Sequence, residues 1–348
     1  MENLEISDEL QSISGIGVII AERLMEIGIC SIAQLATTPL KRLVDAGLSK
    51  SHAWRILEEA VNQCLGKFGF LSGDALLRAQ QRSYLTSGVS ALDKMLGGKG
   101  FESQRVYEVY GPEGSGKSTL LHQLICTAFL PPERGGLGTG AIYIDCEGAF
   151  RLKYVCKLAK RFGIDPDVIA RQIYKATPPN SDALVFLCEQ VLPRVVWETG
   201  SRLICLDTIA TYFRSEYGAC TMSWPERNQA VARVFQAIRH QVECIDGVAV
   251  ITNQVEENKV NFPRRFVHWG LIWHQDAQAR LLMRRRQMGP PTECEVRLEN
   301  AFDLPPKKGR VTINDDGIVD SLTKQSYTRA NSKPRMEYYD EFEEVSEE

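Results

Sequence analysis

The sequence lacks a long hydrophobic run, a paired-cysteine motif and a strong charge of either sign. No 18 consecutive apolar residues occur, so we expect no membrane-spanning helix. The ten cysteines, scattered from Cys30 to Cys294, include no C-x-x-C pair, which excludes zinc-ribbon and thioredoxin-type sites. Such cysteines are typical of reduced, buried thiols. The formal net charge is −3, so any nucleic-acid contact must come from a local basic patch.

Length and composition favour a globular protein with two domains. The chain has 348 residues, of which 44% are hydrophobic and 24% are charged, as in an ordinary soluble protein with a sizeable core. The first residues, Met1 to Glu5, are acidic and contain no apolar signal region, so we expect an intracellular protein.

Residues 1–66 are expected to form a small all-α domain. Leu10, Ile13 and Leu24 recur at helical spacing, and Gly15-Ile16-Gly17 interrupts this pattern. Glycines between two short helices allow a tight turn, and the N–H groups at the next helix start are able to hold a phosphate. The pattern is typical of a helix-hairpin-helix unit that contacts DNA or a protein partner. A plain helical bundle is the alternative.

Two further segments flank the larger domain. Residues 67–84 are predicted to be a linker, because Phe68-Gly69-Phe70 and the polar residues after it suit a tether more than a core. A short helix over Ala75-Leu76-Leu77 is the alternative. Residues 321–348 are expected to be a disordered acidic tail, because seven of the last twelve residues are acidic.

Residues 85–320 are expected to form an α/β domain. Short apolar runs of strand length alternate with longer amphipathic stretches; the runs lie at 106–110, 141–145, 203–207 and 248–252, and the stretches include 180–198 and 226–245. That alternation predicts a mostly parallel, buried sheet with helices on both faces.

The most specific motif is a glycine-rich loop between a predicted strand and a predicted helix. It fits the pattern G-x-x-x-x-G-K-[ST] in full. Glycines let backbone N–H groups surround a phosphate, Lys117 supplies a cation for the β- and γ-phosphates, and the Ser118 hydroxyl suits Mg²⁺. The expected ATP-binding residues are Gly111, Pro112, Glu113, Gly114, Ser115, Gly116, Lys117, Ser118 and Thr119.

Two carboxylates follow neighbouring predicted strands. Asp207 ends the run 203–207, from which it can reach the Mg²⁺ shell, so Ser118 and Asp207 are the expected metal contacts. Glu147 follows the run 141–145, and the ends of parallel strands converge beside the phosphate loop. Glu147 is therefore a candidate base for water; an ordinary loop carboxylate is the alternative.

Together these segments resemble the RecA/RadA-type recombinases of archaea and eukaryotes. The resemblance covers about residues 10 to 320. It includes the motifs Leu85-Thr86-Ser87-Gly88, Leu96-Gly97-Gly98, the phosphate loop, Tyr143 to Arg151, Phe213 to Tyr217 and Ile251 to Val255. It implies a RecA-like P-loop ATPase core with a mostly parallel sheet, preceded by a helix-hairpin-helix domain.

The resemblance also assigns roles to individual residues. Glu147 matches the family's water-activating glutamate, and Gln254 matches the glutamine that senses the γ-phosphate, so Glu147, Lys117 and Gln254 are the expected catalytic residues. Phe70 and Gly73 fall where the family carries a Phe-x-x-Ala tether that docks on the next subunit. Glycine replaces the alanine here, so the second anchor is lost.

The two DNA-binding loops of the family would lie after Tyr217 and after Gln254. The first lacks the family's Gly-Arg-Gly turn, and the second carries interleaved basic and aromatic residues that suit single-stranded DNA. A loop whose tryptophans pack on the sheet is the alternative. The expected DNA contacts are Arg214, Trp224, Arg227, Arg264, Arg265, Trp269 and Trp273.

Three functions are compatible with these features. The favoured one is a recombinase paralogue, a DNA-dependent ATPase that assists a recombinase filament; the others are a strand-exchange recombinase and a P-loop enzyme acting on a small molecule. The departures fall at contacts with subunits and DNA, whereas the phosphate motif is intact. The expected cofactors are ATP and Mg²⁺. The expected partners are single-stranded DNA, also double-stranded DNA, and recombinase-type subunits, in the nucleus of a eukaryote or the cytoplasm of an archaeon.

Overall fold

The structure is a computed structural model. It describes residues 9–64, Gly73, 82–217, 224–254, 277–286 and 292–321. Phe70, the predicted acidic tail and most of the second predicted DNA loop lie outside these residues. Within the described part, no helix combines the length and the apolar character that crossing a bilayer requires.

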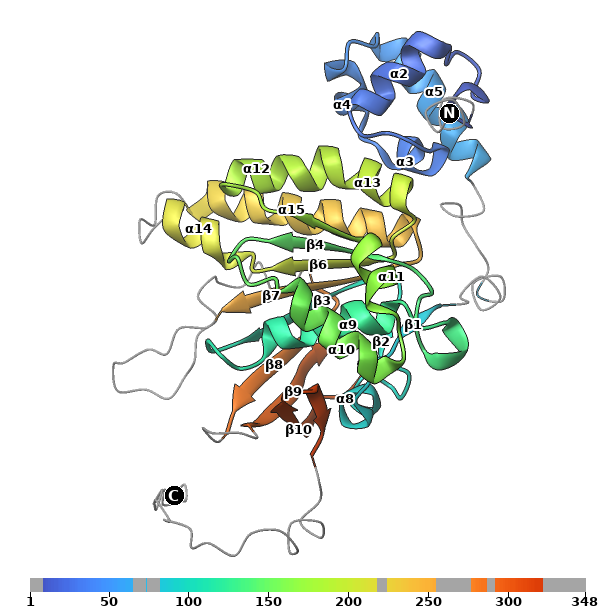
Figure 1. The fold of residues 1–348 in the computed structure, drawn as a ribbon. Coiled ribbons are helices and arrows are strands. Elements are labelled where there is room, and N and C mark those ends of the chain that lie inside the picture. Colours follow the sequence, from blue (N-terminus) through green and yellow to red (C-terminus); the bar gives the residue numbers. More distant parts are fainter. Residues whose placement is uncertain are drawn as a thin grey trace, which may run out of the picture.

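The N-terminal domain is helical, as predicted (Figure 1). Its helices are α2 (Val18–Glu26), α3 (Ile32–Thr37), α4 (Leu40–Asp45) and α5 (Lys50–Gln63). Ser31 and Ser49 cap α3 and α5 by accepting hydrogen bonds from backbone N–H groups three residues later. Leu10, Ile13 and Leu24 are buried in one core, whereas Trp54 on α5 is exposed.

This domain contacts the ATPase core at a break in a long helix. The chain runs from α12 (Ser181–Phe186) through a π-helical turn, η2 (Leu187–Val191), into α13 (Leu192–Thr199). Pro193 has no N–H, so the carbonyl of Glu189 lacks its usual helical donor. Arg42 donates to that carbonyl over 3.0 Å. Thr37 Oγ1 also lies 2.7 Å from His240 Nε2. Arg42 donates to the Gln190 side chain over 2.7 Å, and Gln34 donates to the Gln241 side chain over 3.4 Å, so several hydrogen bonds of α3 and α4 join the domains.

The larger domain is built on a nine-stranded sheet with the order β11-β10-β9-β8-β3-β7-β6-β4-β5. Its strands are β3 (Arg105–Gly111), β4 (Ala141–Asp145), β5 (Ile173–Ala176), β6 (Leu203–Asp207), β7 (Val248–Gln254), β8 (Ala279–Arg285), β9 (Thr292–Ala301), β10 (Lys307–Asn314) and β11 (Gly317–Asp320). The strands from β8 to β5 pair in parallel, and β9, β10 and β11 add antiparallel. The predicted runs form β3, β4, β6 and β7. A small separate sheet pairs β1 (Tyr84–Leu85) with β2 (Phe101–Glu102).

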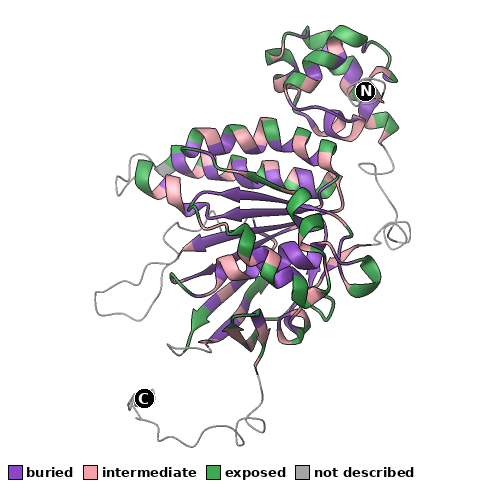
Figure 2. Ribbon diagram, in the orientation of Figure 1, coloured by how far each residue is buried: buried purple, intermediate pink, exposed green. Residues whose placement is uncertain are grey.

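Helices cover both faces of the sheet, and its central strands are buried throughout (Figures 1 and 2). One face packs on α8 (Ser90–Met95), α9 (Lys117–Ala128), α10 (Leu152–Phe162) and α11 (Pro166–Arg171), beside the short 3₁₀ turn η1 (Pro132–Arg134). The other packs on α12, η2, α13, α14 (Ala210–Tyr217) and α15 (Trp224–Cys244). In β4, Tyr143 faces the first layer, whereas Ile142 and Ile144 face the second. A strand buried on both faces reads as a continuous apolar run, which explains the predicted runs.

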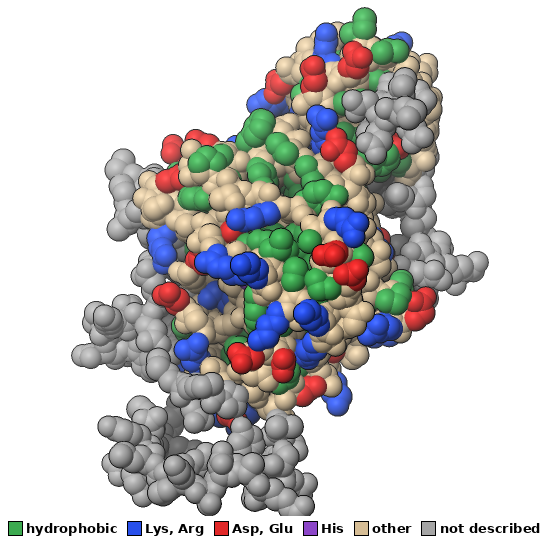
Figure 3. Space-filling view, viewed as in Figure 1, with side chains coloured by type: hydrophobic (Ala, Val, Ile, Leu, Met, Phe, Trp, Pro, Cys, Tyr) green, Lys and Arg blue, Asp and Glu red, His purple; other side chains and the backbone are tan. Residues whose placement is uncertain are grey.

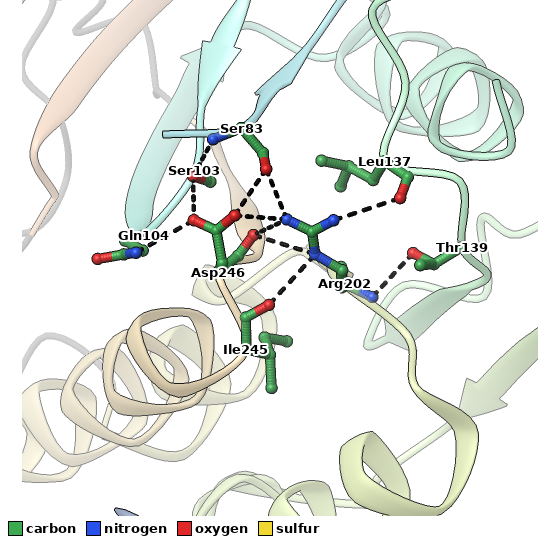
Figure 4. A network of polar contacts seen from close by, with 8 residues as sticks. All are labelled: Ser83, Ser103, Gln104, Leu137, Thr139, Arg202, Ile245 and Asp246. Atoms are coloured by element: carbon green, nitrogen blue, oxygen red, sulfur yellow. Dashed lines mark hydrogen bonds and ion pairs between the residues drawn. The ribbon is translucent and has the colours of Figure 1, made fainter. Parts of the chain in front are cut away.

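A polar network closes the edge of the sheet where the central strands begin (Figure 4). The Arg202 guanidinium forms a 2.6 Å ion pair with Asp246 and donates to the Ser83 hydroxyl over 2.8 Å. Ser103 and Gln104 donate to the same carboxylate. Because Ser83 precedes β1 and Arg202 precedes β6, the network fixes the point where the chain enters the ATPase core.

We expect Arg202→Leu to lower the free energy of unfolding by about 1–3 kcal/mol, because it leaves the half-buried Asp246 carboxylate without its cation. Urea denaturation would measure the change. Arg239→Leu is the control, because Arg239 forms an exposed pair with Glu243, and its removal should cost less than about 1 kcal/mol. Equal effects of both substitutions would contradict a structural role for the network.

Candidate nucleotide-binding site

The phosphate loop connects the end of β3 to the start of α9. Gly116 caps α9 with a φ of 94°, a conformation that favours glycine. A Cβ at Gly116 would lie 2.3 Å from the side chain of Ile313, and one at Gly111 would lie 2.1 Å from the Met283 carbonyl oxygen. The strands β8 and β10 thus press on the loop, and only glycine fits at these two positions.

Polar groups inside the loop suit a phosphate. Lys117 is buried, and its Nζ donates to the carbonyls of Gly111 and Pro112 at 3.0 and 2.9 Å. Burial lowers the pKa of Lys117, while the nearby carboxylates of Glu147 and Asp207 oppose that shift. Among the described residues, the buried Ser115 hydroxyl has no hydrogen-bond partner, which is costly unless a ligand satisfies it. The residues present therefore fit a bound triphosphate.

Asp207 ends β6 with a fully buried side chain. Its carboxylate accepts hydrogen bonds from the Tyr143 hydroxyl over 2.6 Å and from the Thr252 hydroxyl over 2.5 Å. Burial raises the pKa of Tyr143, and so does Asp207, so the phenol remains a donor at neutral pH. Sequence reasoning missed both hydroxyls, because neither position has a distinctive spacing from Asp207.

Glu147 lies on the loop that follows β4. Asp145 holds this loop, because its buried carboxylate accepts the N–H groups of Ala149 and Phe150 and pairs with Lys175 at 2.9 Å. Burial alone would raise the pKa of Asp145, but the hydrogen bonds from Lys175 and the two N–H groups outweigh it and lower the pKa. Sequence reasoning also missed Asp145 and Lys175.

A hydrogen-bonded chain leads away from Glu147. The Gln254 side-chain amide N–H donates to the Glu147 carboxylate, and Arg214 on α14 donates to the Gln254 side-chain oxygen Oε1 over 3.2 Å. Partial burial raises the pKa of Glu147, as does Asp207, while Lys117 and Arg214 oppose the shift. The tertiary structure thus brings Glu147, Gln254 and Arg214 together, although the last two lie 40 residues apart in the chain.

The structure describes only some of the other predicted DNA-contact residues. Arg227 is buried near the start of α15, where it donates to Asn228 over 3.2 Å. The side chain of Trp224 and the residues Arg264, Arg265, Trp269 and Trp273 lie outside the described part of the structure. Figure 3 shows basic and acidic side chains interspersed on the visible face, as expected from the small net charge. The DNA contacts therefore stay a prediction.

His122 packs against residues that line the site. It lies on α9, four residues after Ser118, and its ring contacts Tyr143 and Phe150 with centroids 5.7 and 5.5 Å apart. Its Nε2 accepts the Arg151 N–H over 3.2 Å, which requires the neutral imidazole. Burial lowers the pKa of His122 below its ordinary value of 6.5, although Asp207 opposes that shift.

Comparisons with known proteins agree with this geometry. The Rad51 family model matches residues 78–321, and the model of the SAM-like helix-hairpin-helix tandem matches residues 7–62. Over 250 residues the chain is 31% identical to the DNA repair and recombination protein RadA of Metallosphaera sedula. That similarity covers 71% of this chain and 75% of the relative.

We expect acid to destabilise the protein partly through His122. Because its folded pKa lies below its unfolded pKa, the unfolded chain binds the proton first. The free energy of unfolding should be nearly constant above pH 7 and fall as the pH drops below 6.5, by at most about 1.4 kcal/mol per pH unit for this group. His240 is partly buried with a lowered pKa and should contribute in the same direction.

Urea denaturation at pH 7.5, 6.5 and 5.5 would measure this dependence. His122→Gln keeps a neutral acceptor but does not titrate, so its stability should fall less steeply with acidification than that of the wild type. The slope is compared rather than the absolute stability, because the substitution also alters packing. Identical slopes would show that His122 does not titrate with folding.

Proposed function

The chain belongs to the Rad51 family of RecA-type recombinases, and we propose that it is a recombinase paralogue: a DNA-dependent ATPase that assists or remodels a recombinase filament on single-stranded DNA. A role in DNA recombination and repair follows from the family. The finer assignment is supported by the nucleotide site and by the sequence of the contact regions.

Each group in the site suits one part of ATP hydrolysis. Bound ATP supplies the terminal phosphoryl group that water attacks, and Mg²⁺ neutralises the phosphate charge. Lys117 would balance charge on the β- and γ-phosphates, while Ser118 and Asp207 would hold the Mg²⁺ shell. Glu147 would orient water and take its proton, and its raised pKa makes it a better base than a carboxylate of ordinary pKa.

The observation that carries the proposal is the chain of hydrogen bonds from Glu147 through Gln254 to Arg214. Arg214 lies in the last turn of α14, just before residues 218–223, where the first DNA loop is predicted. Gln254 ends β7, just before the second predicted loop. A γ-phosphate that competes for the Gln254 amide would change a hydrogen bond shared with both loop stems, which could couple nucleotide state to DNA binding.

A paralogue is favoured over a self-assembling recombinase because of the contact regions. The tether carries Gly73 in place of the family's alanine, and the first loop lacks the family's arginine turn. These changes weaken a filament of identical subunits and leave the phosphate chemistry intact. A mixed assembly with a partner recombinase would account for both the altered contact regions and the intact phosphate motif.

We expect measurable ATP turnover that single-stranded DNA increases. Glu147→Gln should retain ATP affinity but lower turnover about 100- to 10,000-fold, because the base is lost while the phosphate loop is kept. Lys117→Ala should lose ATP binding itself. Phosphate release with and without DNA, together with nucleotide titration, would measure these effects.

Two outcomes would contradict the proposal. An ATP turnover rate that is the same with and without single-stranded DNA would favour a small-molecule P-loop enzyme. Long ATP-dependent filaments of the purified protein that exchange strands would favour a recombinase in its own right. Particle size with ATP and DNA separates this last case from a paralogue.

The second loop is expected to supply the DNA surface. Trp273→Ala combined with Arg264→Ala should weaken single-stranded DNA binding about 10-fold or more, because one stacked ring contributes about 1–3 kcal/mol. The matched control is Trp197→Ala combined with Arg239→Ala, which removes an exposed tryptophan and an exposed arginine from α13 and α15. If the two double variants bind DNA equally well, the second loop is not the DNA surface.

A further inference from the structure

The Asp207 carboxylate is held from both sides of its strand. In the sheet order, β6 lies between β7 and β4, and each neighbour supplies one hydroxyl. Tyr143 of β4 donates to Oδ2 over 2.6 Å, and Thr252 of β7 donates to Oδ1 over 2.5 Å. Asp207, Tyr143 and Thr252 are all fully buried, so water cannot replace either bond.

Tyr143 is itself fixed in place. Its ring packs on Phe150 with centroids 4.8 Å apart and stacks on His122 at 5.7 Å with an interplanar angle of 17°. His122 is held in turn by the Arg151 N–H. Phe150 and Arg151 belong to the segment that follows Glu147. Packing therefore holds the Tyr143 ring in an orientation in which its hydroxyl points at Asp207.

An aspartate without such partners turns readily about its last side-chain torsion, because that torsion is broad and nearly two-fold. One donor on each oxygen fixes the plane of the carboxylate. Groups that orient a metal-binding side chain in this way typically change metal affinity 10- to 100-fold when they are removed. Thr252 also donates to the Leu206 carbonyl over 3.3 Å, so its hydroxyl is shared, whereas the Tyr143 hydroxyl has Asp207 as its acceptor.

We propose that Tyr143 is a positioning residue for magnesium-dependent nucleotide binding: its hydroxyl fixes the orientation of Asp207, and it touches neither nucleotide nor metal. This inference rests on the proposed binding of ATP with Mg²⁺. It differs from a packing role, because packing would be preserved by phenylalanine, which keeps the ring and loses only the hydroxyl.

Full-length Tyr143→Phe tests the inference through nucleotide affinity rather than turnover. A fluorescent ATP analogue would be titrated in EDTA and then at increasing Mg²⁺ concentrations. We expect affinity in EDTA to stay within about two-fold of the wild type, because the phosphate loop is unchanged. The Mg²⁺ concentration for half-maximal enhancement should rise about 10-fold.

Tyr107→Phe is the matched control. Tyr107 is a buried tyrosine of β3 whose hydroxyl bonds the backbone of Glu102, away from the phosphate loop. Loss of the Tyr107 hydroxyl should leave the Mg²⁺ midpoint unchanged. Thr252→Val provides a second approach to the same carboxylate from β7, and it should raise the Mg²⁺ midpoint in the same direction should Tyr143→Phe fail to fold.

A Mg²⁺ midpoint in Tyr143→Phe equal to that of Tyr107→Phe would overturn the inference and leave ATP binding in place. If Tyr143→Phe does not fold, an unchanged midpoint in Thr252→Val would overturn it. Wild-type protein that binds no nucleotide even with Mg²⁺ would instead overturn the proposed function, and the inference with it. The two failures are therefore distinguishable by the behaviour of the wild type.

Discussion

The parallel register of four central strands is the constraint on which the rest of the site depends. Gly111 at the end of β3 pairs with Gln254 at the end of β7, and Asp145 at the end of β4 pairs with Asp207 at the end of β6. Backbone hydrogen bonds thus place the phosphate loop, Gln254 and two carboxylates along one edge of the sheet. A shift of one residue in any strand would turn its side chains to the opposite face and dismantle this arrangement.

At that edge, buried polar groups are paired across strands. Asp207 is satisfied by hydroxyls from both neighbours, and Asp145 is satisfied by Lys175 and the loop that carries Glu147. Burying a carboxylate without such partners is costly, so these bonds hold the strand ends and the loop that carries Glu147 in one geometry. The opposite edge is closed in the same manner by Arg202 and Asp246. Between these two edges the core is mostly apolar, apart from the buried ion pair of Arg280 with Glu108.

Hydrogen bonds attach the helical domain to the ATPase core. Arg42 donates to the Glu189 carbonyl, and Thr37 lies within hydrogen-bond distance of His240. Interfaces of this polar kind are typical of domains that move relative to each other. The Rad51 family core and the helix-hairpin-helix tandem are likewise matched as separate units, at residues 78–321 and 7–62.

Local pattern determined the elements and the phosphate site. A strand buried on both faces must be an unbroken apolar run, and a phosphate loop needs glycines at set spacings, so β3, β4, β6, β7 and residues 111–118 were predictable from the sequence. Only the tertiary structure decided which side chains meet. Tyr143, Lys175 and Thr252 are ordinary residues in sequence, and they become site residues because parallel pairing brings strands from distant parts of the chain side by side. The role of the π-helical turn was equally unpredictable from the sequence, because the Glu189 carbonyl becomes a contact only when the fold brings Arg42 near it.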